Sequence, residues 1–423
     1  MADPQGRDFA DGPAAQLDSL DASLPAGRVL TARHTSTAGG SRLLGGMLLA
    51  VLTVAACAPG EGSPADPTDT VGPPAITTSS TPTARDTASS SRTTSHTTSA
   101  PLPDAASSTT TTQAGPGPGL TLAVVGDVML GRTVGERIET DGPGAPLAAV
   151  REDLRGADLT IANLESPIGA EGTPVDKGFT FLAPPAAAQS LQDGGIDVVS
   201  LSNNHILDYG EAVMESTIEL LDEAGIAHVG AGADEEEAYA PVFVEHDGVR
   251  LAFLAYMDVP DEVNGYSMSD WEAGPERPGV AWAHPDRIAA GVTEASSSAD
   301  HVIVLLHTGY EGLEVQSDIQ RTAARTALDS GATLVLGTHP HVLQGVQREQ
   351  GRLIAWSLGN FVFDGFDDIP ETDSAILQLT LDGDGVSDLR WTPVHLVDGF
   401  PEPLDPESAE GRAILDRLEL LSD

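Results

Sequence analysis

Several short polar clusters in this chain each follow an apolar run with the length of a β-strand. They are Gly126-Asp127, Asn163-Leu164-Glu165, Asn203-Asn204-His205, His307-Thr308-Gly309-Tyr310-Glu311 and Gly337-Thr338-His339-Pro340-His341. In an open α/β sheet the ligand site lies beyond the carboxyl ends of the strands, so we expect these clusters to converge in space. Asp, Glu, Asn and His are together the ligands of hard-to-borderline divalent metal ions. The sequence therefore predicts a metal-binding α/β domain.

The clusters differ in how strongly each one indicates a metal site. His339 and His341 flank a single residue and can present both rings to neighbouring metal ions, while Pro340 restricts the backbone between them. The alternative is a pair of solvent-exposed loop histidines. Asp127 follows its strand directly, a position that suits a metal ligand and a helix cap equally well.

Histidine and acidic residues in two of the clusters suggest paired roles. Asparagine beside histidine at a strand end, as in Asn204-His205, seldom serves a hydrophobic core, and Asp208 just downstream is expected to support the histidine or turn the chain. Glu311 follows His307 by four residues, and we expect its carboxylate to hold that imidazole in one tautomer. The alternative for His307 is a satisfied, partly buried histidine.

The elements that must position these clusters are strands that alternate with helices. Apolar runs predict strands over residues 120–125, 159–162, 198–201, 249–256, 302–306, 334–336 and 353–356. Helical periodicity predicts helices over residues 211–224, 286–297 and 317–330, the first of them ending at Gly225. Residues 375–381 and 389–397 are expected to form an antiparallel pair. This order predicts a mixed α/β domain over residues 118–400, followed by a C-terminal tail or helix over 401–423.

The charge of the chain limits its partners. Its net charge is -43, from 64 acidic and 21 basic residues, and Lys177 is the only lysine. Binding to nucleic acid requires a basic surface that displaces counterions, so we expect no nucleic-acid partner. The acidity favours solubility through self-repulsion in a salty exterior.

The first 57 residues have the pattern of a leader. Residues 43–56 are apolar and follow Arg42, but they are shorter than the roughly 20 residues that span a bilayer, which indicates a signal peptide. The single cysteine, Cys57, comes next, and Val54-Ala55-Ala56-Cys57 resembles the lipobox of bacterial lipoproteins. The alternative is an ordinary signal peptide cut after Ala56. The polar stretch before Arg42 is long, which a later translation start would explain.

The residues that follow Cys57 predict how the folded domain is presented. Residues 58–117 are rich in Ser, Thr and Pro with almost no large apolar side chain, so we expect a disordered stalk. A lipid on Cys57 followed by such a stalk would place the domain on the outer face of the cell membrane.

Taken in order, the clusters resemble the CapA family of poly-γ-glutamate capsule synthesis proteins, which is similar in turn to calcineurin-like metallophosphoesterases. The matching motifs lie at residues 126–132, 163–169, 203–210, 307–311, 337–344 and 357–361. They extend over nearly the whole region from Leu120 to Val397. The resemblance implies a four-layer αββα sandwich, in which two β-sheets are flanked by helices.

The resemblance also implies roles for single residues. It implies metal ligation by Asp127, Glu165, Asn204, His307, His339 and His341. In this scheme Asp127 and His341 serve a first ion, Glu165 stands where a carboxylate bridges two ions, and the remaining ligands serve a second ion. The ion would be Mn, Zn or Fe, and His205 would protonate a leaving group. We further expect Arg132 and Asn360 to bind substrate.

The sequence departs from the phosphoesterase pattern at two positions. Met129 stands where that superfamily has the histidine of its opening Asp-x-His motif, and Glu165 is one methylene longer than the usual bridging aspartate. Both departures are what a CapA-like protein shows. They predict one tightly held ion with a weaker or absent second ion.

For function, the resemblance implies synthesis, export or anchoring of poly-γ-glutamate or a related anionic polymer, near a membrane capsule synthase. Two classes stay open. A metal-dependent hydrolase or epimerase, on a phosphoester, polymer or peptide-like substrate, would use His205 as general acid beside the metal-binding Asp127. A non-catalytic accessory lipoprotein would keep the metal site only to hold polymer or synthase. Retention of Asn204 and His205 favours the enzyme, whereas Met129 favours the accessory protein.

Overall fold

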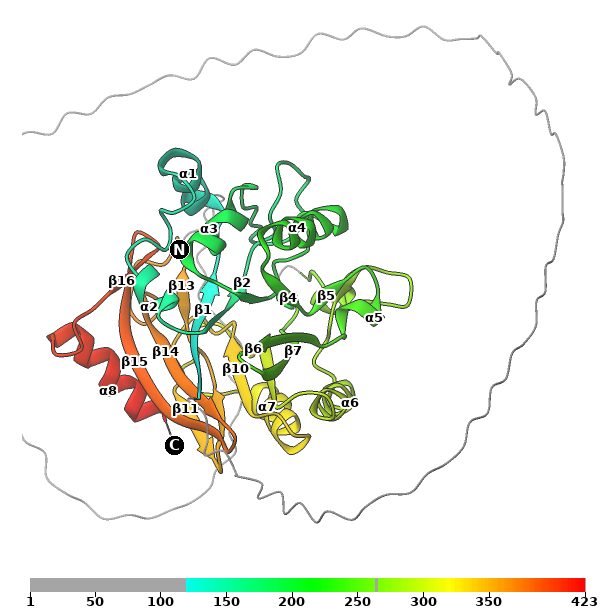
Figure 1. Ribbon diagram of the computed structural model, residues 1–423. Helices are drawn as coiled ribbons and strands as arrows, with labels where there is room; N and C mark the ends of the chain where they lie inside the picture. The colour runs from blue at the N-terminus through cyan, green and yellow to red at the C-terminus, as the bar shows by residue number, and fades with distance from the viewer. Residues whose placement is uncertain (1–118, 263–264, 423) are drawn as a thin grey trace, which may run out of the picture. The chain divides into compact units, whose positions relative to one another are not determined.

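The computed structural model describes residues 119–262 and 265–422 (Figure 1). The predicted signal peptide over residues 1–57, the predicted lipidation site Cys57 and the predicted stalk over residues 58–117 lie outside the described residues. Among the residues that are described, no helix is both long enough and apolar enough to cross a membrane.

In the described part of the chain, the larger sheet has eight strands in the order β16-β15-β14-β1-β2-β3-β4, with β13 also paired to β1. Their bounds are β1 Leu120–Val128, β2 Leu159–Leu164, β3 Val198–Ser200, β4 Ala227–Val229, β13 Asn360–Val362, β14 Asp373–Asp382, β15 Gly385–Val397 and β16 Phe400–Pro403. Strands β1 to β4 run parallel, and β14 runs antiparallel to β1. Every residue of β2 and β3 is buried, as expected for parallel strands covered on both faces.

The second sheet has six strands within the same ranges, in the order β11-β12-β10-β9-β7-β6. Their bounds are β6 Val242–His246, β7 Val249–Asp258, β9 His301–Thr308, β10 Leu334–Thr338, β11 Val346–Glu349 and β12 Arg352–Ala355. Strands β7, β9, β10 and β12 are parallel, and β6 and β11 pair antiparallel at the two edges. A small separate pair joins β5 (Ala231–Gly232) to β8 (Gly279–Val280).

Helices cover the outer face of each sheet (Figure 1). Helices α1 (Arg132–Asp141), α2 (Arg151–Arg155), α3 (Ala187–Gly194) and α4 (Glu211–Ala224) pack on the first sheet, and α6 (Pro285–Ser296) and α7 (Asp318–Asp329) pack on the second. A third apolar layer, which includes the fully buried Leu122, Phe253 and Ile303, lies between the sheets. The predicted four-layer αββα sandwich is therefore confirmed.

The domain continues past residue 400. Strand β16 pairs with β15, and helix α8 (Ala409–Leu421) buries Ile414 and Leu418 against Leu343 and Ala375. The C-terminal segment is thus a helix that belongs to the core, not a loose tail. A short helix, α5 (Glu235–Ala238), and a 3-10 turn over Met268–Trp271 complete the described elements.

Residues 356–359, which lead from β12 to β13, join the two sheets. The Leu358 amide donates to the Gly337 carbonyl at 3.2 Å on the second sheet, and the Asp127 amide donates to the Gly359 carbonyl at 3.0 Å on the first. A Cβ on Gly337 would overlap the Trp356 carbonyl oxygen, and a Cβ on Gly126 would overlap that of Gly359. Each sheet therefore needs a glycine where it meets the joining segment, one residue before Asp127 and one before Thr338.

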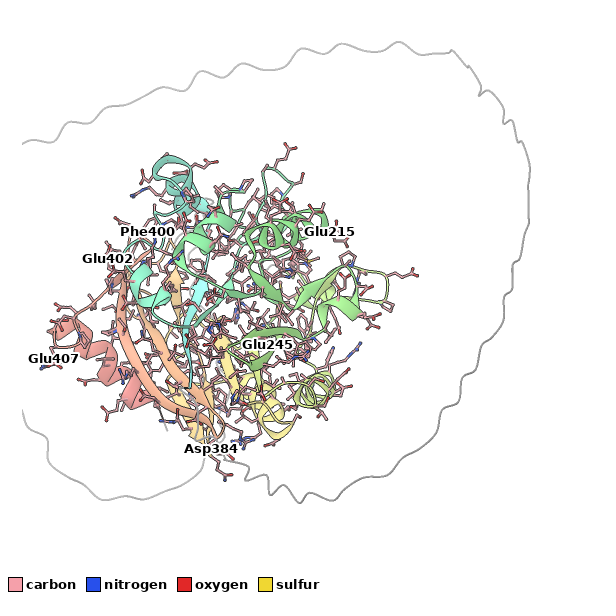
Figure 2. The ribbon with its side chains drawn as sticks, viewed as in Figure 1. Glu215, Glu245, Asp384, Phe400, Glu402 and Glu407 are labelled. Atoms are coloured by element: carbon pink, nitrogen blue, oxygen red, sulfur yellow. The ribbon has the colours of Figure 1, made fainter. Side chains whose placement is uncertain are left out.

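The negative charge lies on the surface. Side chains such as Glu215, Asp384 and Glu407 are exposed and lie at the periphery of the domain (Figure 2). This distribution agrees with acidity that acts through solvation, since the interior carries few of these groups.

Candidate metal centre

The polar clusters converge at the carboxyl ends of the central strands. Asp127 is the last residue but one of β1, Glu165 follows β2, His205 follows β3, and His307 is the last residue but one of β9. His339 and His341 come directly after β10, where both adopt positive φ angles of 93° and 59°. Left-handed backbone is uncommon for a residue other than glycine, and such strain concentrates at functional sites.

A buried amide organises the carboxylates. The Asn163 side-chain nitrogen lies 2.8 Å from Asp127 Oδ1 and 3.1 Å from Glu165 Oε2, and it is also 3.2 Å from Nδ1 of His307. The Asn163 side-chain oxygen accepts from the amide of Asn203 at 3.1 Å. Asn163 therefore fixes both carboxylates relative to each other, although the sequence reasoning gave it no role.

One carboxylate oxygen in this cluster has no hydrogen bond. Glu165 Oε1 lies 4.0 Å from His205 Nε2, 3.8 Å from His307 Nε2 and 3.7 Å from His341 Nε2. It is buried and has no hydrogen-bond partner among the described residues. Buried polar atoms are nearly always paired, so an orphaned carboxylate oxygen facing three imidazole nitrogens suits a cation.

Neighbouring side chains hold the rings of His307 and His341. His307 Nε2 lies 2.7 Å from Asn204 Oδ1, and His307 Nδ1 lies 3.0 Å from Thr338 Oγ1. His341 Nδ1 lies 2.8 Å from Asn360 Oδ1 and 3.3 Å from Asp127 Oδ2. Such partners orient an imidazole and fix its tautomer.

His205 is supported by an arrangement of its own. Its Nδ1 lies 2.6 Å from Asp208 Oδ2, and Lys177 Nζ lies 2.7 Å from Asp208 Oδ1. Lys177 also donates to the Asn204 carbonyl and lies 3.2 Å from His205 Nδ1. The Phe181 ring packs on the imidazole, with centroids 4.2 Å apart. Sequence reasoning placed Asp208 beside His205 but missed Lys177, whose only signal was that the chain has no other lysine.

Burial raises the pKa of each acid in the site, but neighbouring groups reverse the shift for one of them. Burial and the negative charge of Asp127 raise the pKa of Glu165 well above its usual value. Burial also opposes ionisation of Asp127, but the hydrogen bond and charge of His341 outweigh it, so the pKa of Asp127 is lowered. Burial raises the pKa of Asp208 to about 7 in spite of Lys177.

Burial favours the neutral form in three of the four histidines of the site. It lowers the pKa of His205, His307 and His339 well below the usual value. For His341 burial acts in the same direction, but the hydrogen bond and charge of Asp127 outweigh it and raise the pKa. Neutral imidazole is the form that binds a metal ion.

Two groups of side chains could hold a cation. Asp127, Glu165 and His341 form a buried group, and Glu311, His339 and His341 form a second one, with ligand atoms of each group within 4.8 Å of one another. The donor set and the orphaned Glu165 oxygen therefore fit a divalent ion. Glu311 is not where we expected it: it lies with His339 and His341, whereas the hydrogen-bond partners of His307 come from β2, β10 and Asn204.

The two residues expected to bind substrate also have protein partners. Asn360 is fully buried, and its two polar side-chain atoms contact His341 and the Glu371 carbonyl, so it orients an imidazole. Arg132 is 42% exposed and pairs with Asp364 at 3.0 Å. Its guanidinium carbon also lies 5.6 Å from the centre of the Phe181 ring, and that ring in turn packs on His205. Arg132 is therefore at the edge of the site, and Asn360 is inside its wall.

Comparison with known proteins identifies the family. Residues 121–365 match the family described as Bacterial capsule synthesis protein PGA_cap. The chain is 32% identical over 294 residues to the capsule biosynthesis protein CapA of Bacillus anthracis, covering 67% of this chain and 69% of that relative. It is 31% identical over 303 residues to the PGA biosynthesis protein CapA of Bacillus subtilis (strain 168), covering 71% and 77%.

A solved structure of 5'-nucleotidase from Candida albicans is 11% identical, with a TM-score of 0.36, and covers 72% of this chain and 57% of that one. Similarity at this level carries no information about activity. The family match spans most of the described domain, and the alignments to the two Bacillus relatives cover 67% and 71% of this chain. This chain belongs to the bacterial capsule synthesis protein family PGA_cap.

Proposed function

We propose that the protein is a metal-dependent enzyme, of hydrolase type, that acts on an anionic surface polymer such as poly-γ-glutamate. The observation that carries the proposal is the orphaned oxygen of Glu165, which faces three imidazole nitrogens in a buried site. The residues that would hold a divalent ion (Mn, Zn or Fe) are Asp127, Glu165, Asn204, His307, His339 and His341. When bound, such an ion polarises a carbonyl or phosphoryl oxygen or lowers the pKa of water.

His205 is the proposed proton-transfer residue. Its Nδ1 is occupied by Asp208 at 2.6 Å, which leaves Nε2 toward the site, 4.0 Å from Glu165 Oε1. Nε2 is therefore the atom that would pass a proton to a leaving group or take one from water. The paired Asp208 and Lys177 hold the ring in that orientation, and the packing of Phe181 excludes water from one of its faces.

A second candidate function rests on Met129. Its side chain is fully buried in an apolar cluster with Phe181, Phe363 and Leu396, and its sulfur accepts from the Gly131 amide at 3.1 Å. No metal ligand can come from this position without loss of that packing. The alternative is therefore an accessory protein that uses the site to hold polymer or a membrane synthase.

One variant separates the two functions. His205→Ala should abolish hydrolysis or polymer production while metal content and thermal stability stay near those of the unchanged protein. His228→Ala, a histidine outside the site that contacts Asp222, is the matched control. Full polymer production in His205→Ala would support the accessory function and contradict catalysis by His205.

Metal content is tested independently of activity. Elemental analysis of the purified protein should find a divalent ion that His339→Ala loses in whole or in part. Addition of the ion to chelator-treated protein should raise its melting temperature, because a ligand that binds only the native state stabilises it by about 2.7 kcal/mol at 100 times its dissociation constant. Metal-free protein whose melting temperature ignores added ions would contradict the metal site.

The place of action is also a proposal. An acidic domain repels a polyanion, so polymer contact would run through the ion and through Arg132 at the edge of the site. We further propose that a lipid on Cys57 anchors the protein to the outer face of the membrane, near a capsule synthase. Metabolic labelling with a fatty-acid analogue should tag the unchanged protein and not Cys57→Ser; equal labelling of both would contradict the anchor.

A further inference from the structure

A second ligand group overlaps the buried one and extends toward solvent. The carboxylate of Glu311 and ring nitrogens of His339 and His341 lie within 4.8 Å of one another. Glu311 is exposed, whereas the two histidines are only 3% and 4% exposed. His339 Nδ1 is buried without a hydrogen-bond partner in the part of the chain that the structure describes. Buried polar atoms nearly always have a partner, so this ring nitrogen indicates a missing ligand.

The loop that carries Glu311 is fixed beside the two histidines. The Gly312 amide donates to the Pro340 carbonyl at 2.9 Å, which ties the residue after Glu311 to the turn between His339 and His341. Further along the loop, the Leu313 carbonyl accepts from the Gln344 side chain at 2.6 Å. The position of Glu311 is thus set by two hydrogen bonds on its own loop, one of which reaches the turn between the two histidines.

Met129 and Glu311 follow strands of different sheets, and one side chain is apolar and buried whereas the other is charged and exposed. The first sheet offers a thioether in an apolar cluster at residue 129, where a nitrogen ligand would complete a site. The second sheet offers a carboxylate after β9, next to the two histidines that follow β10. A carboxylate beside His339 and His341 would supply a ligand that the buried Met129 side chain does not offer.

We propose that Glu311 is a direct ligand of a divalent cation, together with His339 and His341. This deepens the proposed function and rests on its metal site. Glu311 is neither a hydrogen-bond partner of His307 nor one more solvated surface acid. Glu311 is the exposed member of the group. Removal of its carboxylate should therefore weaken binding of the ion without disturbing the buried network around Asn163.

Cobalt binding to metal-depleted protein tests the proposal without any substrate. Co²⁺ is titrated while its ligand-field absorption and the heat of binding are recorded, for the unchanged protein, Glu311→Gln and Glu314→Gln. The control residue lies on the same loop, is also partly exposed, and is paired with Arg417. Glu311→Gln should lower the affinity for Co²⁺ by at least about 10-fold and should change the absorption spectrum. Loss of a residue that only hydrogen-bonds to a metal ligand already costs about this much affinity. Glu314→Gln should leave both unchanged.

The outcomes separate this proposal from the one beneath it. If Glu311→Gln keeps the affinity and the spectrum of the unchanged protein, Glu311 is not a ligand, while the buried metal site stands. If Glu314→Gln weakens Co²⁺ binding as much as Glu311→Gln does, loss of negative charge near the site explains both effects, and the proposal is overturned. If the unchanged protein binds no Co²⁺, Mn²⁺ or Zn²⁺, both proposals fail. Melting temperatures of the metal-depleted variants confirm that each one folds.

Discussion

The two sheets contribute different chemistry to the same site. The first sheet supplies the buried carboxylates, the amides and His205, with Asp127 and Asn163 inside strands and Glu165 one residue beyond. The second sheet supplies the other imidazoles and the exposed Glu311, with His307 inside β9 but His339 and His341 on a turn with positive φ angles. The acids are held by hydrogen bonds from the Asn163 side chain, whereas the histidines after β10 lie on strained backbone and leave one ring nitrogen without a hydrogen-bond partner among the described residues.

This difference shows where the site is rigid and where it needs a ligand. On the first sheet, regular strands place the side chains and a shared amide satisfies them. On the second sheet, strain in the backbone persists because the surrounding structure over-determines it. The complete site exists only where the sheets meet, so each half can be disturbed separately.

The largest effect is expected from the glycines at which each sheet meets the joining segment. In Gly126→Ala and Gly337→Ala the new methyl group would overlap a backbone carbonyl of residues 356–359. We expect each to lose more than about 4 kcal/mol in the free energy of unfolding, measured by urea denaturation. Gly383→Ala, in the open β14–β15 turn with no atom within 4 Å of the added methyl, is the control. A small loss at only one of the two positions would mean that the sheets do not depend equally on the segment.

A loss nearly as large is expected on the side of the first sheet from Lys177→Met. The side chains of Lys177 and Asp208 are 1% and 0% exposed, so the variant leaves a buried carboxylate without its cation. Removal of one partner of such a pair costs about 3–5 kcal/mol, which denaturation at neutral pH should detect. Lys177→Met combined with Asp208→Asn should recover part of that stability. If the single variant is as stable as the unchanged protein, the pair makes no net contribution and the idea that it supports His205 loses its basis.

Asn163→Leu tests whether the amide network on the first sheet is required. The variant removes the side-chain nitrogen that donates to Asp127 and Glu165. Because both carboxylates are buried, water cannot replace the lost donor. Loss of a buried hydrogen bond of this kind costs on the order of 1–3 kcal/mol. We expect the deficit to shrink when a divalent ion is added, since the ion would neutralise the same oxygens. A deficit that ignores added ions would separate the network from metal binding.

The smallest effect is expected at the start of helix α7, which covers the second sheet. Ser317 and Gln320 form a reciprocal capping box, in which the hydroxyl accepts from the Gln320 amide at 3.2 Å. Ser317→Ala should lower the free energy of unfolding by about 1 kcal/mol, while Ser317→Asp should retain most of it. Because the cap lies six residues after Glu311, unchanged Co²⁺ affinity in Ser317→Ala would show that the ligand loop does not depend on the helix end.

Much of the fold could be predicted from apolar runs and from glycines that end helices. The run before Asp127 and the run before His307 became β1 and β9, and Gly225 ends α4 with a φ of 71° as predicted. The short strands β4, β5, β6, β8, β11, β13 and β16 were missed, because runs of two to five residues carry too few positions to define a period. Helix α1 was also missed: Arg132 opens it after an uncapped Gly131, and the helix is strongly polar.

The site was predicted less evenly than the fold. Strand-end position brought together Asp127, Glu165 and the histidines, because parallel strands direct their carboxyl ends to one edge. Lys177 lies between residues 170 and 180, where no periodicity indicates which way a side chain points. Glu311 was assigned to the wrong histidine because sequence distance favours His307, whereas the Gly312–Pro340 hydrogen bond that sets its neighbours joins two separate loops.

The segment at residues 356–359 also bears on motion. Its hydrogen bonds reach Asp127 on one sheet and Gly337 on the other, directly behind the ligands. A hinge that opened the sheets apart at this edge would have to break these bonds and unseat both glycines, which resembles local unfolding more than a functional movement. Entry and exit of a substrate are then left to the surrounding loops, and the ligand geometry should stay the same whether the site is empty or filled.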